Sequence, residues 1–219
     1  MTSVTIPSSV TSIGSGAFYG NSLNNVNIPN SVINIGSGAF KGLSESDITL
    51  GTGYTTYFTY SSDSKTLEGH IGTPNSDLDL TSLPAEVTSI EYQAFDDSGI
   101  NSVDLGDSTN VTTIDDYAFR GNNITNIDIP DGVTSIGKYA FTDNGMTGVT
   151  LPTGLTSIDE HAFYENLLTS VTIPNSVVSI GDHAFEMNSL ETLAFEAGSN
   201  LATIEQDTFN NAFNQVANT

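Results

Sequence analysis

The side chains of this sequence that could do chemistry are its carboxylates, asparagines and three histidines, because it contains no cysteine. Asp104 and Asp128 each stand between two apolar residues. If the fold brings these carboxylates side by side, with the amide oxygens of Asn101 and Asn126 nearby, they offer the hard oxygen ligands that Ca²⁺ prefers. We therefore predict a weak Ca²⁺ site at Asp104 and Asp128. The alternative is two hydrated acids on an open face.

His161 and His183 form a second candidate, since each stands two residues before a phenylalanine and each has acidic neighbours. Such a pair could hold a divalent metal. Glycine, glutamine, tyrosine or aspartate occupies the same position elsewhere in the chain, which favours an ordinary solvent-facing column. Nucleophilic catalysis has no support, because cysteine and a Gly-x-Ser-x-Gly turn with triad partners are missing from the sequence. A carboxylate-dependent glycoside hydrolase would need a cleft around two acids, which a surface of small residues does not provide.

A unit of about 22 residues must position these side chains, because it recurs along the chain. It reads Leu-x-x-Val-x-Ile-Pro-x-x-Val-x-x-Ile-x-x-x-Ala-Phe-x-x-Asn-x and is nearly intact from Leu168 to Phe185. Its phenylalanine column is Phe18, Phe40, Phe95, Phe119, Phe141, Phe163, Phe185 and Phe209. Six of the seven prolines share one column, so the period is not accidental.

The spacing within the unit predicts how it folds. Val-x-Ile is a period-2 pattern that turns both apolar side chains to one side, and the following proline ends the strand. One unit cannot close a core alone, so stacked units should bury each apolar column as a ladder. We expect Phe163 to lie buried between Phe141 and Phe185. The asparagine three residues after phenylalanine should be buried and should bond turn backbone of adjacent repeats, as at Asn144, Asn166 and Asn188.

These residues resemble the BspA-type branch of the leucine-rich repeats over about five-sixths of the chain. The resemblance implies a β-rich solenoid, a right-handed leucine-rich-repeat horseshoe with parallel strands and repeats of about 22 residues. Members are typically bacterial or protozoan surface proteins that bind host or neighbouring-cell molecules without catalysis. The chain departs from the family pattern by carrying asparagine where many members carry cysteine, and by an irregular stretch at 51–80.

Three segments are expected. Residues 1–50 form a first block of repeats, residues 51–80 an irregular β-hairpin insertion, and residues 81–219 a second block with a frayed tail. The hairpin is predicted because β-prone runs at 54–60 and 66–71 flank Ser-Ser-Asp-Ser-Lys. A signal peptide and a recognisable N-terminal cap are not evident, so we expect a fragment of a longer protein whose targeting signals lie outside it.

The charge of the chain is strongly negative, at −22 from 26 acidic and four basic residues. Nucleic-acid binding needs a basic surface, so we expect no nucleic-acid partner. No apolar run reaches membrane-spanning length, so we expect no membrane insertion by this segment. The charge can serve solubility alone, or it can attract cationic partners and divalent ions.

The outward positions of the predicted strands are the best candidate for a binding surface, because they are small and mostly polar along the chain. The residues that we expect to bind are Asn27, Thr49, Asn101, Asp104, Asn126, Asp128, Thr150 and Thr172. Together with the resemblance, this surface predicts a non-catalytic binding or adhesion segment of a bacterial cell-surface protein. Its partner would be a protein, peptide or glycan on another cell or in the matrix. The alternative is a passive spacer or scaffold within a larger adhesin.

Overall fold

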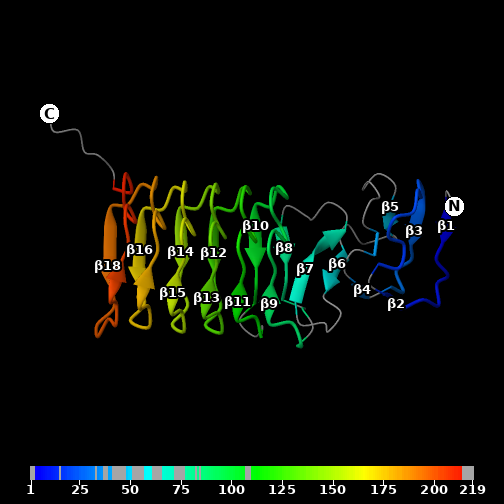
Figure 1. The fold of residues 1–219 in the computed structure, drawn as a ribbon, viewed down its shortest axis with the longest axis horizontal. Helices are drawn as coiled ribbons and strands as arrows, with labels where there is room; N and C mark the ends of the chain where they lie inside the picture. The colour runs from blue at the N-terminus through cyan, green and yellow to red at the C-terminus, as the bar shows by residue number, and fades with distance from the viewer. Residues whose placement is uncertain are drawn as a thin grey trace. The chain divides into compact units, whose positions relative to one another are not determined.

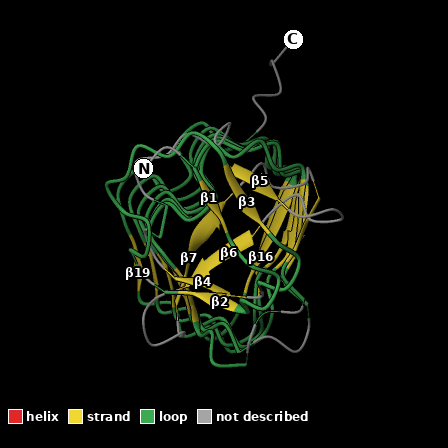
Figure 2. Ribbon diagram, turned by 90° about the vertical axis from the view of Figure 1, so that its right-hand side faces the viewer, coloured by secondary structure: helices red, strands yellow, loops and turns green. Residues whose placement is uncertain are grey.

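A computed structural model of the chain describes residues 3–14, 16–32, 34–36, 39–40, 48–50, 57–60, 66–71, 77–81, 83, 85–106 and 110–213. It divides into two compact units, Met1–Asn75 and Ser76–Thr219. Figure 1 shows the strands within each unit following one another in chain order. Figure 2 shows only strands and loops, with no helix in the described residues. Accordingly, a helix that could span a membrane is not found among them.

Each complete repeat of the second unit contributes two short strands. The first strands are β8 (Asp77–Asp79), β10 (Ser102–Asp104), β12 (Asn126–Asp128), β14 (Gly148–Thr150), β16 (Ser170–Ile173) and β18 (Thr192–Phe195). The second strands are β9 (Ser89–Ile90), β11 (Thr113–Ile114), β13 (Ser135–Ile136), β15 (Ser157–Ile158), β17 (Ser179–Ile180) and β19 (Thr203–Ile204). Between them the chain turns at proline: the Pro174 carbonyl accepts a hydrogen bond from the Val177 N–H at 3.2 Å. Proline cannot donate to a ladder, which is why the first strand ends there.

The strands of neighbouring repeats pair in parallel. The second strands form a ladder from β9 to β19 in which isoleucine faces isoleucine, as Ile136 faces Ile158 and Ile158 faces Ile180. The first strands pair in twos: β8 with β10, β12 with β14, and β16 with β18. Each repeat therefore forms one turn of a parallel-strand β-solenoid, and this part of the predicted fold class is confirmed.

The first unit repeats this arrangement and ends in a hairpin. β1 (Val4–Thr5), β3 (Val26–Ile28) and β5 (Ile48–Leu50) pair in parallel, as do β2 (Ser12–Ile13), β4 (Asn34–Gly36) and β6 (Tyr57–Tyr60). β6 then pairs antiparallel with β7 (Thr66–Ile71), in agreement with the two β-prone runs of the predicted hairpin. Residues 51–56, 61–65 and 72–76 lie outside the described residues. The predicted division at residues 50 and 80 therefore stays a prediction, as does the frayed tail beyond Phe213.

The core of the second unit is a column of phenylalanine rings. Phe95, Phe119, Phe141, Phe163 and Phe185 are fully buried. Their ring centroids follow one another at 5.3–5.4 Å with interplanar angles of 5–9°. Phe163 lies between Phe141 and Phe185, as the spacing predicts. Because each ring is covered by the repeats on both sides, one repeat alone could not bury it.

The asparagine column satisfies backbone groups of two repeats at once. The Asn166 side-chain amide donates to the Phe141 carbonyl at 2.9 Å and to the Phe163 carbonyl at 3.3 Å. Its Oδ1 accepts from the Met146 N–H at 3.1 Å. The same kinds of bond recur at the equivalent asparagines, Asn122, Asn144 and Asn188. The predicted ladder is confirmed, except that Asn144 is half-buried rather than buried.

The turn that carries the Ala-Phe pair of each repeat, such as Ala162 and Phe163, is called the Ala-Phe corner below. Its backbone is left-handed on both sides of the phenylalanine. Around Phe163, φ is 57° at His161 and 55° at Glu165. Positive φ recurs at both equivalent positions around other phenylalanines, at Gln93 and Asp97, Tyr117 and Gly121, Tyr139 and Asp143, His183 and Met187, and Asp207 and Asn211. For most L-residues this conformation costs about 1–2 kcal/mol. Hydrogen bonds to the next repeat offset that cost, since the His161 N–H donates to the Asp182 carbonyl at 2.9 Å.

Candidate functional site

In β8, β10, β12, β14 and β16 one polar residue faces outward between two apolar residues. We call the outward side chains of these strands, and of the corresponding strands of the first unit, the strand face. In β12, for example, Asp128 is exposed while Ile127 and Ile129 are buried, as the period of a strand requires. All eight residues predicted to bind are exposed: Asn27 and Thr49 in the first unit, and Asn101, Asp104, Asn126, Asp128, Thr150 and Thr172 in the second. Their exposure agrees with the prediction, whereas their binding stays a prediction.

Strand pairing brings some of these residues together. Asn27 and Thr49 are partners in the ladder of β3 and β5, and Asp128 and Thr150 are partners in that of β12 and β14. Asn101, by contrast, lies in a bend before β10 and takes no part in a ladder. The strand face of the second unit is therefore a series of paired positions rather than one unbroken row.

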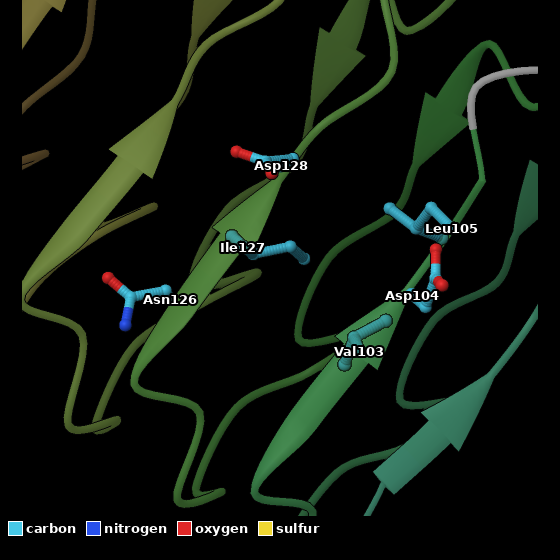
Figure 3. A pocket seen from close by; sticks show the side chains of 6 residues that line it. All are labelled: Val103, Asp104, Leu105, Asn126, Ile127 and Asp128. Atoms are coloured by element: carbon cyan, nitrogen blue, oxygen red, sulfur yellow. The ribbon is translucent and has the colours of Figure 1, made fainter.

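A hollow opens on the strand face between β10 and β12. The ladders of β8 with β10 and of β12 with β14 do not continue across it. The hollow has a volume of about 260 Å³ and is lined by Val103, Asp104, Leu105, Asn126, Ile127 and Asp128. Figure 3 shows these side chains along the two neighbouring strands. The hollow thus contains both carboxylates of the predicted calcium site, next to the Asn126 amide.

Each of the two carboxylates has a hydrogen-bond partner of its own. Asp104 Oδ1 accepts from the Gly106 N–H at 2.9 Å, and Asp128 Oδ1 accepts from the Thr150 hydroxyl at 2.8 Å. In the described part of the chain, no group of three or more His, Cys, Asp or Glu side chains is placed to hold a metal. The Ca²⁺ site stays a prediction. Calorimetric titration of CaCl₂ into the protein and into an Asp104→Asn, Asp128→Asn variant tests it.

The basic side chains that the structure describes are both engaged in ion pairs. The Arg120 guanidinium bonds the Asp96 carboxylate in bidentate fashion, at 2.7 and 2.9 Å. The Lys138 ammonium lies 3.0 Å from the Glu160 carboxylate. Both cations lie at the Ala-Phe corner. Among the described residues, the strand face therefore carries carboxylates without a basic side chain to neutralise them.

The second predicted cluster is a stack of rings at the Ala-Phe corner. The ring centroids of Tyr117, Tyr139, His161 and His183 follow one another at 4.9, 4.5 and 4.7 Å. The expected stacking of the two histidines is confirmed, but the column is half-buried rather than fully solvent-facing. Rings stacked face to face do not direct their nitrogens toward one shared ion. The hypothesis of a divalent metal at this pair accordingly finds no support.

The two imidazoles differ in their surroundings. His183 Nδ1 is hydrogen-bonded to the Glu186 carboxylate. His161 Nδ1 is buried without a hydrogen-bond partner, and the nearest carboxylate oxygen, from Glu160, is 3.5 Å away. Burial, together with the positive charge that His183 can carry, holds the pKa of His161 below its ordinary value. The surroundings of His161 therefore favour the neutral form of its imidazole.

Several solved structures are similar to this chain. A leucine rich cell surface protein from Faecalibacterium prausnitzii A2-165 is 28% identical, with 94% of this chain and 48% of that chain covered and a TM-score of 0.46. A leucine-rich repeat protein from Eubacterium ventriosum ATCC 27560 is 21% identical, with 85% and 64% covered and a TM-score of 0.38. The pneumococcal vaccine antigen PcpA is 19% identical, with 95% and 55% covered and a TM-score of 0.42. The chain spans about half the length of the first of these proteins.

A search of curated proteins finds no match. The family model described as the BspA type leucine rich repeat region matches in six copies, over residues 1–111, 74–191 and 112–217. These matches include every repeat described above. The chain belongs to the BspA-type leucine-rich-repeat family.

Proposed function

We propose that this chain is the non-catalytic binding or adhesion segment of a bacterial cell-surface protein, and that it recognises a protein, peptide or glycan through the strand face. Membership of the family suggests a repeat-based binding or scaffold role. The observation that carries the finer proposal is the strand face itself. Small polar side chains stand exposed on it at the regular spacing of paired strands, above a row of buried apolar residues.

The hollow between β10 and β12 is the part of the strand face best suited to recognition. Asp104 and Asp128 can accept hydrogen bonds there, and the Asn126 amide can both donate and accept. A ligand that presents N–H or O–H donors, or a cationic group, would complement these groups. The flanking strands would contact an extended ligand on either side.

Binding arrays of glycans and of peptides test the proposal, with the wild-type chain compared with an Asp104→Asn, Asp128→Asn variant. The control is an Asp143→Asn, Glu165→Gln variant, which removes two exposed charges from the Ala-Phe corner instead. We expect the first variant to lose at least about tenfold in affinity, or about 1.4 kcal/mol, and the control to bind normally. Equal losses of affinity in both variants would show that Asp104 and Asp128 act only through the overall charge of the chain.

The second candidate is a passive spacer or scaffold within a larger adhesin. The continuous phenylalanine and asparagine ladders favour it, because they would give the second unit stiffness without any ligand. A chain that binds nothing in either array would support this role. Turnover of generic glycosides by the purified chain would instead revive the third hypothesis, a carboxylate-dependent hydrolase.

A further inference from the structure

One asparagine of the column differs from the others in the residue that follows it. The residues that follow the column asparagines are Ser22, Asn123, Gly145, Leu167 and Ser189. Asn144-Gly145 is also the only Asn-Gly pair in the sequence. Asparagine is a thermolabile residue. It is most reactive before glycine, because a residue without a Cβ leaves its backbone nitrogen free to approach the asparagine side chain.

The reaction open to this pair needs only water as a co-reactant. The Gly145 nitrogen loses its proton and attacks Asn144 Cγ. The new carbon–nitrogen bond closes a succinimide ring, and the side-chain amide leaves as ammonia. Water then opens the ring at one of its two carbonyls. The product is aspartate, or isoaspartate, in which the backbone continues through the former side chain.

The fold holds both reacting groups in place. Ile124, in the preceding repeat, accepts a hydrogen bond from the Gly145 N–H at 3.1 Å. Its own N–H donates to Asn144 Oδ1, also at 3.1 Å. The attacking nitrogen and the side-chain carbonyl that it would attack are therefore both fixed by one fully buried residue.

The leaving group is held as well. The Asn144 amide donates to the Phe119, Phe141 and Thr142 carbonyls at 3.0, 3.2 and 3.2 Å. Ring closure would require the amide to leave these partners and the Gly145 N–H to leave Ile124. The fold resists such a change, because polar groups inside it would lose their hydrogen bonds. The reaction therefore requires that this repeat first opens by local unfolding.

We propose that Asn144-Gly145 is a self-modification site controlled by the asparagine ladder, which protects it in the closed repeat and exposes it to conversion when the repeat opens. The product cannot restore the ladder. An aspartate would place a carboxylate among three carbonyl oxygens, and an isoaspartate would lengthen the backbone between Phe141 and β14. Each conversion would therefore make a transient opening of the chain permanent.

Peptide mapping by mass spectrometry tests the site, because conversion of an amide to an acid changes the peptide mass. The wild-type chain is incubated in mildly alkaline buffer, with and without enough urea to unfold it. In urea, Asn144 should be converted before any other asparagine. Without urea its conversion should be at least about tenfold slower, because only the open fraction reacts. Asn101, which is exposed and precedes Ser102, is the internal control and should differ much less between the two conditions.

Two variants separate the role of the glycine from that of the ladder. Gly145→Ala should slow the conversion in urea by about tenfold, because a Cβ hinders the attack. It should leave the fold intact, since that Cβ would lie 3.8 Å from the nearest atom. Asn166→Ala removes the next amide of the ladder, which bonds the Phe141 carbonyl and the Met146 N–H. It should speed the conversion of Asn144 without urea and leave the rate in urea unchanged.

The consequence for the fold is measured separately. Asn144→Asp reproduces one of the products and should lower the melting temperature, whereas Gly145→Ala should not. A wild-type chain that converts Asn144 as fast without urea as with it would overturn the protection by the ladder. Conversion of Asn144 no faster than that of Asn101 in urea would overturn the site itself. A melting temperature that Asn144→Asp leaves unchanged would show that the product restores the ladder, against the proposal.

Discussion

At the scale of single residues, the asparagine column shows how a polar side chain can belong to a core. Successive turns bring backbone carbonyls close together, and buried groups of this kind are costly when they lack a partner. The Asn188 amide bridges the Phe163 and Phe185 carbonyls at 2.9 Å each. Its Oδ1 accepts from the Leu168 N–H at 3.0 Å. An amide suits the position because it donates and accepts at once, which neither a carboxylate nor an aliphatic side chain does.

Replacing Asn166 should therefore destabilise the chain. Asn166→Ala leaves buried donors and acceptors unpaired and should lower the free energy of unfolding by about 1–3 kcal/mol. Asn166→Asp should lower it further, because a carboxylate would face carbonyl oxygens. Asn21→Ala is the control: Asn21 stands in the same column but is exposed and donates only to the Phe18 carbonyl among the bonds that the structure shows. Urea unfolding measures all three, and equal losses at Asn21 and Asn166 would contradict the role of burial.

His161 is a residue whose contribution should depend on pH. Around its ring lie His183, Glu160, Glu186 and Asp182, with Tyr139 on one face and the Tyr164 ring edge-on. Its pKa is lowered in the folded state, chiefly by burial, so the unfolded chain binds the proton more readily. The neutral imidazole therefore makes its full contribution to folding stability above pH 6.5, the ordinary pKa of histidine. That contribution is lost as the pH falls from there through the pKa of the folded state.

His161→Tyr should remove this dependence. Tyrosine occupies the same column at Tyr117 and Tyr139, with φ of 61° and 57°, so the backbone of the corner accepts it. At about pH 8 the variant and the wild type should unfold at similar urea concentrations, and at about pH 5.5 the variant should be the more stable. Tyr139→Phe serves as a control with no change in titration in that range. Parallel stability curves for wild type and His161→Tyr would rule out the titration of His161 as the cause.

At the scale of elements, the Ala-Phe corner depends on positions where the backbone is left-handed. Gly121 has a φ of 68°, and a Cβ built on it would lie 2.0 Å from Asp97 Oδ1. Asp97 can move, but the backbone strain remains, because a side chain at positive φ costs about 1–2 kcal/mol. Gly145, nearby in the next repeat, has an ordinary φ, and its Cβ would lie 3.8 Å from the nearest atom, the Ile124 carbonyl oxygen.

Gly121→Ala should therefore lower the free energy of unfolding by about 1–2 kcal/mol. Gly145→Ala should leave it unchanged or raise it slightly, because alanine reduces the entropy of the unfolded chain. Thermal unfolding of the two variants provides the comparison. A larger loss at Gly145 than at Gly121 would show that the left-handed conformation is not what the corner requires of glycine.

The elements also show how far the sequence could predict the molecule. Phe163, Asn166 and the parallel strands follow from spacing, because a side chain that recurs at one position in stacked turns must meet its own copies. Positive φ at His161 and Glu165 was not predicted, although a signal exists: Gly16 and Gly20 stand in the same two columns, and glycine adopts that conformation most readily. The hollow between β10 and β12 could not be predicted from the repeat, since it depends on which first strands pair. The exposure of Asp104 and Asp128 was predictable from period 2, whereas their separate hydrogen-bond partners were not.

At the scale of the whole chain, the dominant feature is 22 excess negative charges. Asp159 shows their effect at one site. It is half-buried, and burial raises the pKa of its carboxyl, as do Asp116 and Glu205 nearby, although a hydrogen bond from Ser157 acts in the opposite direction. A raised carboxyl pKa means that the charged form opposes folding. This side chain therefore favours the folded state at low pH, and that contribution is lost as the pH rises through its folded pKa.

Screening should consequently stabilise the folded chain. Raising NaCl from about 0.02 to about 0.5 M shortens the range of charge repulsion to a few ångströms. We expect a gain of about 1 kcal/mol, or about 2–4 °C in melting temperature for a chain of this length. Asp159→Asn should raise the melting temperature at low salt and neutral pH, and it should reduce the further gain from salt. Asp143→Asn removes the same charge from an exposed position and should do less of both. A melting temperature that does not change with NaCl would mean that the acidic residues are spaced widely enough for water alone to screen them. The melting temperatures of Asp159→Asn and Asp143→Asn would then differ only because Asp159 is half-buried.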